Sequence, residues 1–252
     1  MEPTRELLAR FDGALMGASA LVTGAGSGIG RAVSVALARA GADVALLGRR
    51  TDRLEQTAAR IEAADRRAVV LPTDVTDDDA VRAAVETAAD RLGPASIAVA
   101  SAGANGWGEI EEQSPDLVRS ALRANVEGVA SLARAVVPAM RQQRAGKLIV
   151  VASDNGRRAE AGGSAYVASK FAAVGLSLSI AQELYADGIG VHVIEPGCVD
   201  TDWYPPEEDA PRDRMLSADD VAYVALFLAT LPASIVLEEV LMLPRGLLVA
   251  PW

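Results

Sequence analysis

Tyr166 and Lys170, a tyrosine and a lysine four residues apart, are the pair in this sequence best suited to proton transfer. Side chains at this spacing project from one face of a helix, so Lys170 can hold a positive charge near the Tyr166 phenol. A free tyrosine titrates at about pH 10, and a neighbouring cation favours the phenolate. We therefore expect Lys170 to lower the pKa of Tyr166 far enough for proton exchange with a substrate oxygen, to which Ser153 can also hydrogen-bond.

Four glycines lie within seven residues, in the segment Thr23-Gly24-Ala25-Gly26-Ser27-Gly28-Ile29-Gly30, between an apolar run and a helical pattern. Glycines at a strand-to-helix turn let the backbone approach a pyrophosphate, whose charge the amino end of the helix stabilises. The alternative is a tight turn without a ligand, but four glycines exceed what a turn needs. The segment predicts a dinucleotide phosphate site.

The glycine spacing T-G-x-x-x-G-x-G resembles that of the short-chain dehydrogenase/reductase family. Other signatures of that family follow in order. Tyr166-Val-Ala-Ser-Lys170 matches its Y-x-x-x-K motif, Ser153 precedes the tyrosine by thirteen residues, and Asn125 matches its helix asparagine. Two further segments match as well, Asp74-Val75 and Pro196-Gly-Cys-Val-Asp-Thr201. The resemblance extends from about Leu15 to Pro244, and the joint order of the motifs makes it specific.

The resemblance implies an enzyme that moves a hydride between a nicotinamide and a ketone or secondary alcohol, with a small or medium substrate such as a 3-oxo acid. It implies that Tyr166 is the acid in carbonyl reduction and the base in alcohol oxidation, that Lys170 also binds the nicotinamide ribose, and that Asn125 positions a water. The residues expected at the cofactor are Gly24, Ser27, Gly28, Ile29, Gly30, Arg49, Arg50, Asp74, Val75, Ala102, Gly103, Tyr166, Lys170, Pro196, Gly197, Val199 and Thr201.

The end of the second apolar run indicates which nicotinamide cofactor binds. An acid there would bind the ribose 2′-hydroxyl of NAD(H) and repel a 2′-phosphate. This chain has Gly48 followed by Arg49 and Arg50, which leave room for a phosphate and supply its counter-charge. We therefore expect NADP(H), with Arg49 as the main contact; the alternative is that both arginines are merely solvated at a helix start.

Two positions depart from the family pattern. Where the family has Asn-Asn-Ala-Gly, this chain has Ala100-Ser101-Ala102-Gly103, so the asparagine that usually braces neighbouring strands is lost and Ser101 is the candidate to replace its hydrogen bonds. The usual asparagine of the sixth strand is His192, which we interpret as a structural side chain in mid-strand.

Six residues near the expected reaction site are candidates to line the substrate pocket: Trp107, Asp154, Asn155, Cys198, Trp203 and Tyr204. Their apolar and aromatic share favours a partly apolar carbonyl compound. Cys198 can face the substrate, although a small buried side chain is the commoner role for such a cysteine. Residues 200–216 hold three prolines and many charges, which predicts a mobile flap over the site.

Short apolar runs that alternate with helical patterns must position these residues. Six of the seven runs are continuous and β-branched, which is typical of parallel strands covered on both faces. The runs are Ser19–Thr23, Val44–Leu47, Ala68–Leu71, Ile97–Ser101, Leu148–Ala152, Val191–Ile194 and Ile235–Leu243, and the clearest helical segments are Gly30–Ala40, Thr51–Ala64, Asp77–Leu92 and Ser164–Tyr185. The pattern predicts an α/β fold in which residues 1–252 form a single-domain, doubly wound, Rossmann-like parallel sheet of about seven strands with helices on both faces, preceded by an extension at 1–16.

Three local signals refine these helices. Thr76 stands before three aspartates, which predicts that its hydroxyl caps the helix that follows. Ser217 and Asp220 have capping-box spacing, and Pro232 should end the helix that they begin.

Composition limits the other classes of function. The 252 residues carry a net charge of −10, which disfavours nucleic-acid partners. A single cysteine, Cys198, excludes an internal disulfide and a multi-thiolate zinc site, so we expect no bound metal. The amino terminus lacks the apolar core of a signal peptide, and the apolar stretch Val221–Leu237 is broken by Pro232. We expect a cytoplasmic protein without a membrane partner.

Two alternative functions are a catalytically silent dinucleotide sensor or scaffold, and an extended family member acting on nucleotide sugars. The joint presence of Ser153, Tyr166 and Lys170 argues against the first, and the short chain after Tyr166 argues against the second. The resemblance also implies a homodimer or homotetramer built from the helices that carry Asn125 and Tyr166. Small residues on the second helix allow close packing: Ala165, Ala168, Ala172, Ala173 and Gly175.

Overall fold

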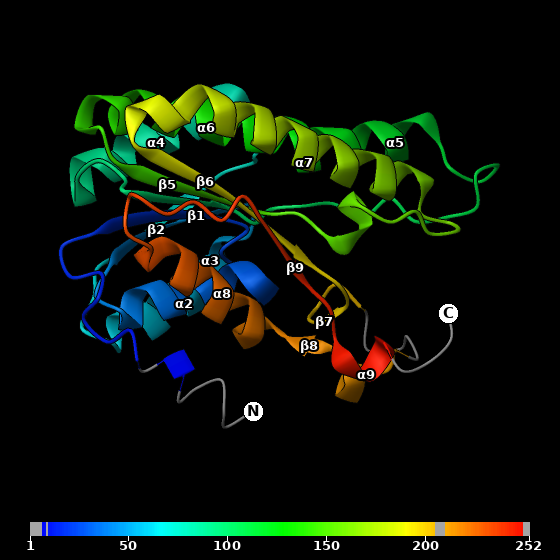
Figure 1. Ribbon diagram of the computed structural model, residues 1–252, viewed down its shortest axis with the longest axis horizontal. Coiled ribbons are helices and arrows are strands. Elements are labelled where there is room, and N and C mark those ends of the chain that lie inside the picture. Colours follow the sequence, from blue (N-terminus) through cyan, green and yellow to red (C-terminus); the bar gives the residue numbers. More distant parts are fainter. Residues whose placement is uncertain (1–6, 9, 205–209, 249–252) are drawn as a thin grey trace.

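Seven parallel strands form the central sheet of the computed structural model, which describes residues 7–8, 10–204 and 210–248 (Figure 1). The strand order is β3-β2-β1-β4-β5-β6-β9. The strands are β1 (Ser19–Thr23), β2 (Asp43–Gly48), β3 (Ala68–Pro72), β4 (Ile97–Ala100), β5 (Gly146–Val151), β6 (Ile189–Pro196) and β9 (Glu239–Met242). A second, two-stranded sheet pairs β7 (Val199–Asp200) with β8 (Leu216–Ser217).

Helices cover both faces of the sheet. The helices are α2 (Gly28–Arg39), α3 (Thr51–Glu62), α4 (Asp78–Leu92), α5 (Pro115–Leu122), α6 (Gly128–Gln143), α7 (Ser164–Leu184), α8 (Ala218–Thr230) and α9 (Arg245–Leu248). One face carries α4, α6 and α7, and the opposite face carries α2, α3 and α8 (Figure 1). The predicted doubly wound α/β fold is therefore confirmed.

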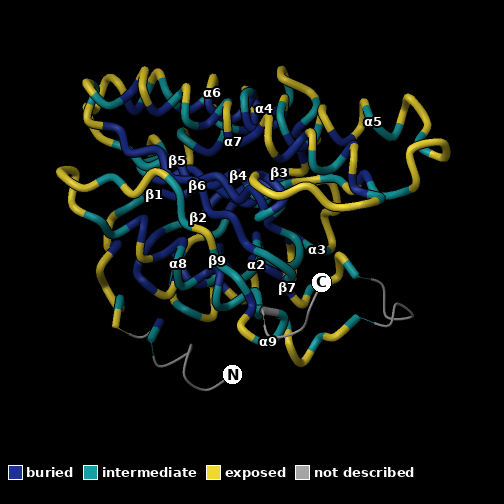
Figure 2. The backbone as a smooth tube through the Cα atoms, turned by 45° about the vertical axis from the view of Figure 1, so that its right-hand side comes forward, coloured by how far each residue is buried: buried dark blue, intermediate teal, exposed yellow. Residues whose placement is uncertain are grey.

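The core consists of two apolar layers, one on each face of the sheet. Alternate residues of a strand point to opposite faces, so Leu46 packs toward α2 and α3 whereas Leu47 packs toward α4 and α6. The central strands are buried along their length (Figure 2). Burying one such leucine stabilises the fold by about 1.5–3 kcal/mol, so the sheet holds the loops at its carboxyl edge on a rigid base.

The seventh strand is shorter than the run Ile235–Leu243 predicted. It comprises only Glu239–Met242, because α8 ends at Thr230 and a turn follows in which the Ile235 amide donates to the Pro232 carbonyl. Pro232 thus ends the helix as expected, and the same turn delays the strand.

One helix start was predicted wrongly and another correctly. The cap of α4 is Asp77, whose Oδ1 accepts the Ala80 amide at 3.0 Å, whereas the Thr76 hydroxyl donates to Asp74 at 2.9 Å. The Thr76 hydroxyl is therefore engaged with Asp74 and does not cap the helix. At α8 the capping box of Ser217 and Asp220 is present in both directions.

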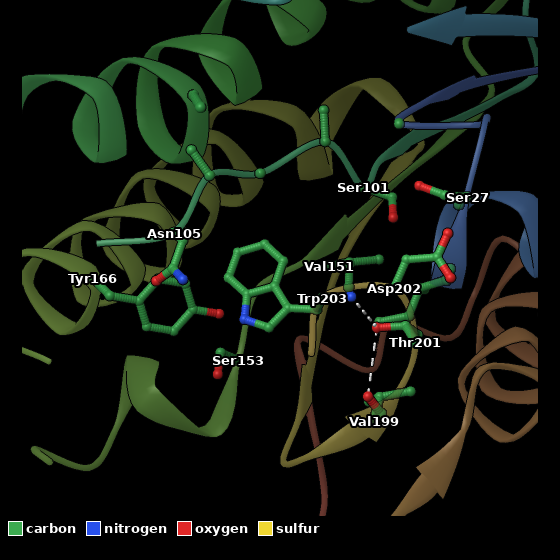
Figure 3. A pocket seen from close by; sticks show the side chains of 18 of the residues that line it. Ser27, Ser101, Asn105, Val151, Ser153, Tyr166, Val199, Thr201, Asp202 and Trp203 are labelled. Carbon is green, nitrogen blue, oxygen red and sulfur yellow. Dashed lines mark hydrogen bonds between the residues drawn. The ribbon is translucent and has the colours of Figure 1, made fainter. Parts of the chain in front are cut away.

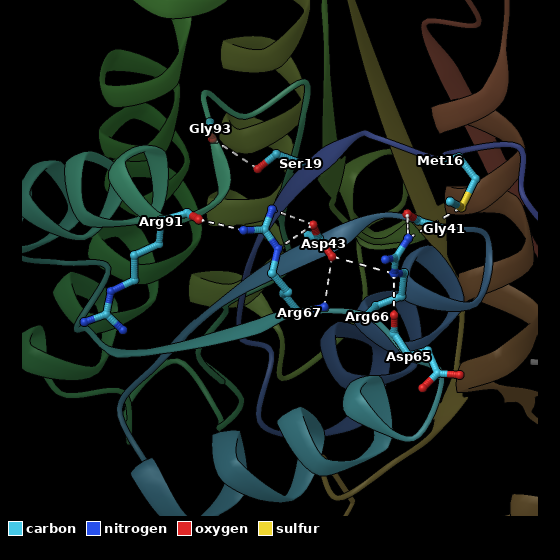
Figure 4. Close-up of polar contacts among 9 residues, drawn as sticks. All are labelled: Met16, Ser19, Gly41, Asp43, Asp65, Arg66, Arg67, Arg91 and Gly93. Carbon is cyan, nitrogen blue, oxygen red and sulfur yellow. Dashed lines mark hydrogen bonds and ion pairs between the residues drawn. The ribbon is translucent and has the colours of Figure 1, made fainter.

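The amino ends of β2 and β3 are joined by an ionic cluster on Asp43 (Figure 4). Asp43 accepts the Arg67 amide and Nε at 2.9 Å each, and Arg66 Nε lies 3.7 Å from Asp43 Oδ1. Burial acts to raise the pKa of Asp43, but the Arg67 hydrogen bonds outweigh it and lower that pKa. The cluster fixes the sheet at the edge opposite the catalytic candidates.

Among the described residues, one helical stretch, Ser164–Asp187, is long and apolar enough by length and composition to cross a membrane. It contains α7, which packs against β6 and α5. Half of its most apolar window is buried inside the protein, and we interpret it as a core helix.

Candidate active site

A cavity of about 1150 Å³ opens at the carboxyl ends of the parallel strands, where the strand order reverses between β1 and β4. This is the position at which open α/β sheets bind ligands. With the exception of Asn125, every residue predicted at the cofactor, the catalytic centre or the substrate lines this cavity. Segments up to 180 positions apart in the sequence thus meet at one place.

The glycine loop between β1 and α2 is too tightly packed for larger residues. A β-carbon on Gly30 would lie 2.3 Å from the Gly24 carbonyl oxygen, and one on Gly24 would lie 2.9 Å from the Ala102 backbone. Gly24 and Gly28 also have positive φ angles, which favour glycine. No side chain caps α2 at Ser27, so the first amides of this helix are available to an anion. The loop therefore fits a pyrophosphate.

Two arginines follow β2 and line the cavity near the glycine loop. Arg49 and Arg50 are exposed and line the cavity, and Arg50 Nη2 lies 3.4 Å from Ser27 Oγ. Asp74 accepts the Thr76 amide and hydroxyl, and the pKa of its carboxyl is lowered, first by that amide and further by Arg49. This end of the cavity presents positive charge at its rim, as an additional phosphate requires.

Ser153 and Tyr166 lie together at the other end of the cavity (Figure 3), which Lys170 also lines. Ser153 lies close enough to the Tyr166 phenol for its hydroxyl to act to lower the pKa of that phenol. Lys170 Nζ lies 5.6 Å from the centre of the Tyr166 ring and 3.4 Å from the Val151 carbonyl oxygen. Because Tyr166 and Lys170 lie in the first two turns of α7 and Ser153 follows the end of β5, the junction of helix and sheet sets their geometry.

The pKa of Tyr166 is not lowered, as the sequence analysis expected, but raised. Burial raises the pKa of Tyr166 to about 12; the Ser153 hydrogen bond acts in the opposite direction, while the charges of Asp154 and Glu160 raise it further. Burial also lowers the pKa of Lys170 to about 8. The prediction from the four-residue spacing was wrong in sign because spacing says nothing about desolvation or about the carboxylates from other segments.

Asn125 is buried and acts on the backbone around the cavity. It lies in a π-helical turn, Arg123–Glu127, between α5 and α6, and such turns are frequent at functional sites. Its side chain accepts the Ala104 amide at 2.8 Å and donates to the Ala104 carbonyl at 3.1 Å and to Ser169 Oγ at 2.8 Å. Asn125 thereby joins the loop after β4 to α7.

Thr23, a residue that the sequence did not single out, braces β1 against the loop after β4. Its hydroxyl accepts the amides of Ser101 and Ala102 at 3.1 and 3.2 Å. The Ser101 amide, not its hydroxyl, takes part in this brace, and the Ser101 side chain lies in the cavity (Figure 3). A threonine at the end of a strand gives no sequence signal for this role.

Three aromatic rings surround the reaction end of the cavity. The ring centres of Trp107 and Tyr166 are 5.9 Å apart, and those of Tyr166 and Trp203 are 5.7 Å apart. Cys198 is partly buried; burial raises the pKa of its thiol, and Tyr204 hydrogen-bonds it. The predicted substrate residues therefore share one wall, although Cys198 is not the fully buried side chain that we considered commoner.

Two carboxylates lie on this wall, and the sequence indicated only the first of them. Asp154 follows Ser153 directly, and burial raises the pKa of its carboxyl. Glu160 comes from the loop before α7, where its Oε2 accepts Asn155 Nδ2 at 3.2 Å. No motif identifies Glu160, because only the fold of that loop brings it to the cavity.

The predicted flap at 200–216 is tied down at both ends. The β7–β8 pair joins Asp200 to Ser217, and Arg212 Nη1 binds Asp200 at 2.5 Å. Thr201 packs on the glycine loop, since a β-carbon on Gly28 would lie 3.2 Å from Thr201 Cγ2. Residues 205–209 lie outside the described part of the chain.

His192 lies in β6, away from the cavity lining. It is fully buried, and its Nδ1 is 2.8 Å from the Leu237 carbonyl oxygen. Burial lowers the pKa of its ring and favours the neutral form. Across residues 7–8, 10–204 and 210–248, no three His, Cys, Asp or Glu side chains are grouped so as to hold a metal ion.

Comparison with known proteins identifies the family. Residues 18–211 match the short chain dehydrogenase family. The chain is 34% identical over 242 residues to the glycine betaine reductase ATRR of Emericella nidulans, covering 92% of this chain but only 19% of that protein. It is 33% identical to an uncharacterized oxidoreductase of Staphylococcus aureus, covering 89% of this chain and 96% of the relative.

Solved structures agree with this result. An alcohol dehydrogenase of the archaeon Thermococcus sibiricus, complexed with 5-hydroxy-NADP, superposes with a TM-score of 0.85 at 28% identity over 91% of this chain and 97% of that one. A metagenomic short-chain oxidoreductase in complex with NADP gives 0.81 at 31% identity, over 92% and 99%. The chain belongs to the short-chain dehydrogenase/reductase family and is an oxidoreductase of that type.

Proposed function

We propose that this protein is an NADP(H)-dependent oxidoreductase that interconverts a ketone and a secondary alcohol of small to medium size. The observation that carries the proposal is the joint placement of Ser153, Tyr166 and Lys170 in one cavity with the glycine loop. A sensor or scaffold would not require all three side chains at the reaction end, and we do not favour that alternative.

The residues of the cavity fit the cofactor along its whole length. In our proposal the amides of the glycine loop and α2 hold the pyrophosphate, Asp74 and Val75 bracket the adenine, and Lys170 binds the nicotinamide ribose. The exposed guanidinium groups of Arg49 and Arg50 bind the ribose 2′-phosphate. NADP or a derivative is the ligand in two similar structures, which supports the same choice here.

Proton transfer is assigned to Tyr166. When bound, the nicotinamide supplies or accepts the hydride. Tyr166, with its pKa raised to about 12 by burial, keeps its proton at neutral pH and is set to donate it to a carbonyl oxygen that Ser153 also hydrogen-bonds. Lys170 is positively charged below its pKa of about 8 and stabilises the phenolate that remains after the transfer.

Asn125 is proposed as a positioning residue that also places a water near Lys170. Its bond to Ser169 supports this, because the Ser169 hydroxyl in turn donates to the Tyr166 carbonyl at 2.6 Å. The remaining cavity residues Ala102, Gly103, Pro196, Gly197, Val199 and Thr201 are assigned to the nicotinamide half of the cofactor.

At the level of the whole chain, we propose one domain of residues 1–252 with an extension at 1–16 and a substrate flap at 200–216. Within the extension, Leu8 and Leu15 are buried in the core and Phe11 packs edge-on against Tyr223 of α8. We further propose a cytoplasmic homodimer or homotetramer that acts on a small molecule.

A screen of ketones with NADPH, followed at the nicotinamide absorbance, tests the proposal. We expect oxidation of NADPH with at least one ketone, and loss of at least about 10³-fold of kcat in Tyr166→Phe, which removes the transferable proton. Cofactor binding by Tyr166→Phe, measured by fluorescence, should stay within a few-fold of wild type. Full activity of Tyr166→Phe would contradict the assignment.

A further inference from the structure

The carboxylate of Asp154 is partly buried at the reaction end of the cavity without a cationic partner. Within the described residues its carboxylate accepts a hydrogen bond from the Ser153 hydroxyl, 3.3 Å away, and the Asn155 backbone amide also acts to lower its pKa. None of the ion pairs among residues 7–8, 10–204 and 210–248 includes Asp154. A partly buried charge that lacks a counter-ion is costly, and a bound ligand is one way to offset that cost.

A second carboxylate, that of Glu160, lies near Asp154 at the cavity wall. Glu160 lies close enough to raise the pKa of Asp154, and it also lines the cavity. Arg158 lowers that pKa by more than Glu160 raises it, but Arg158 forms no ion pair with Asp154 and does not line the cavity. Arg157 is bound to Glu195 at 2.5 Å and Glu239 at 2.6 Å and does not line the cavity. The wall of the cavity around Asp154 therefore carries two carboxylates, whereas the Lys170 ammonium lies near the Tyr166 ring.

The same pocket is walled by aromatic rings. Trp107, Tyr166 and Trp203 follow one another at centre distances below 6 Å, and Tyr204 lines the cavity beside them. Faces of Trp and Tyr attract cations, and the attraction is strongest for Trp. Rings and carboxylates on one wall are the elements that recognise an ammonium group.

We propose that the substrate carries a cationic, amine-type or quaternary ammonium group a few bonds from its carbonyl or alcohol carbon, bound by Asp154 and Glu160 within the wall of Trp107, Trp203 and Tyr204. The short separation follows from the chain itself, because Asp154 is the neighbour of Ser153, which holds the reacting oxygen. This inference rests on the proposed function and names its substrate class.

A substrate cation would also serve the chemistry at Tyr166. The charges of Asp154 and Glu160 both hinder ionisation of the phenol. A positive group between these carboxylates and the phenol offsets their effect, so a cationic substrate assists its own proton transfer. A neutral substrate leaves that unfavourable field in place.

The test compares two ketones that differ in one atom. Acetonyltrimethylammonium has a positive nitrogen where methyl neopentyl ketone has a neutral carbon, and both carry a methyl ketone. With NADPH, we expect wild type to prefer the cation in kcat/KM by at least about tenfold, and Asp154→Asn to lower that preference by about tenfold or more through the KM of the cation. Comparing the preference between variants cancels the difference in intrinsic reactivity of the two ketones.

Asp90→Asn is the matched control. Asp90 is exposed on α4 and lies outside the cavity, so this variant changes net charge equally and should keep the wild-type preference. Glu160→Gln, at an exposed side chain, should lower the preference in the same direction but by less, and it provides a second variant should Asp154→Asn fail to fold. An unchanged preference in both carboxylate variants would overturn the inference.

A binding measurement separates this inference from the proposed function. If neither ketone is reduced by any variant, the proposed function is decided by the wider ketone screen described above. Calorimetry of acetonyltrimethylammonium with the NADP-saturated protein then decides the cation site by itself. Binding that weakens in Asp154→Asn but not in Asp90→Asn supports the site, and absent or equal binding in all three proteins overturns it.

Discussion

Arg49 is the residue on which, in our proposal, the choice of cofactor depends. It is exposed at the end of β2, where the neighbouring Gly48 has no side chain to fill the space. We expect Arg49→Ala to raise the KM for NADPH by about tenfold or more while the KM for NADH changes little, because only NADPH carries the 2′-phosphate. Steady-state kinetics with both cofactors give this comparison.

Arg91→Ala is the control for that experiment. Arg91 is exposed and lies at the opposite edge of the sheet, near Arg67 (Figure 4). Removing its charge should leave the ratio of the two KM values unchanged. A wild-type preference for NADH, or equal effects of Arg49→Ala on both cofactors, would contradict the assignment.

Lys170 should leave a signature in the pH dependence of stability. Burial lowers its pKa from 10.5 to about 8, so the folded state binds this proton less strongly than the unfolded state. Below about pH 8 this difference lowers the free energy of unfolding by its full amount. The effect disappears as the pH rises toward 10.5, where both states lose the proton. The lowering of the Lys170 pKa from 10.5 to about 8 corresponds to a free-energy difference on the order of 3 kcal/mol.

Lys170→Met isolates this contribution, since methionine does not titrate. In the protein without cofactor, we expect the variant to be more stable than wild type at neutral pH, and we expect its advantage to shrink between about pH 8 and pH 10. Urea unfolding of both proteins at constant ionic strength provides the difference. A difference that does not change with pH would show that Lys170 keeps an ordinary pKa.

At the scale of elements, the sequence and the structure give different capping residues for the start of α4. Asp77 rather than Thr76 bonds to the helix, so Asp77→Ala should lower the free energy of unfolding by about 1 kcal/mol. Thr76→Ala loses only a hydroxyl bond to Asp74 and should cost less. Denaturant unfolding of the two variants orders them, and a larger loss in Thr76→Ala would favour the sequence prediction.

The elements themselves were predictable because their signals are local. Continuous β-branched runs marked six strands, and the capping box and Pro232 marked both ends of α8. The seventh strand began later than predicted, since its apolar run includes a turn whose hydrogen bonds a hydropathy pattern does not show.

The site was predictable to the extent that its residues belong to motifs. The glycine loop, Ser153 and the Tyr166–Lys170 pair meet in one cavity as expected. The brace at Thr23 and the charge of Glu160 were not predictable, because each depends on segments that only the folded sheet brings together. The sign of the Tyr166 pKa shift was wrong for the same reason, as burial is a property of the whole molecule.

At the scale of the whole molecule, α7 presents a row of side chains to the outside beside α5. Three of its small residues are exposed: Ala168, Ala172 and Gly175. Phe171 lies between them and is 46% exposed. The other two small residues, Ala165 and Ala173, are buried within the protein. Small exposed residues with one large apolar side chain suit close packing of this helix against a second copy of itself.

We therefore expect Phe171→Arg to convert the proposed oligomer into a smaller species. In a two-fold interface the same residue occurs on both sides, so one substitution places two arginines in the contact. Light scattering after gel filtration should give a multiple of 26.1 kDa for wild type and a lower mass for the variant. Ile110→Arg, at a side chain that is 71% exposed in the loop before α5, should leave the mass unchanged. A wild-type mass of one chain, or an unaltered mass in Phe171→Arg, would exclude α7 as the interface and leave its apolar row without a partner.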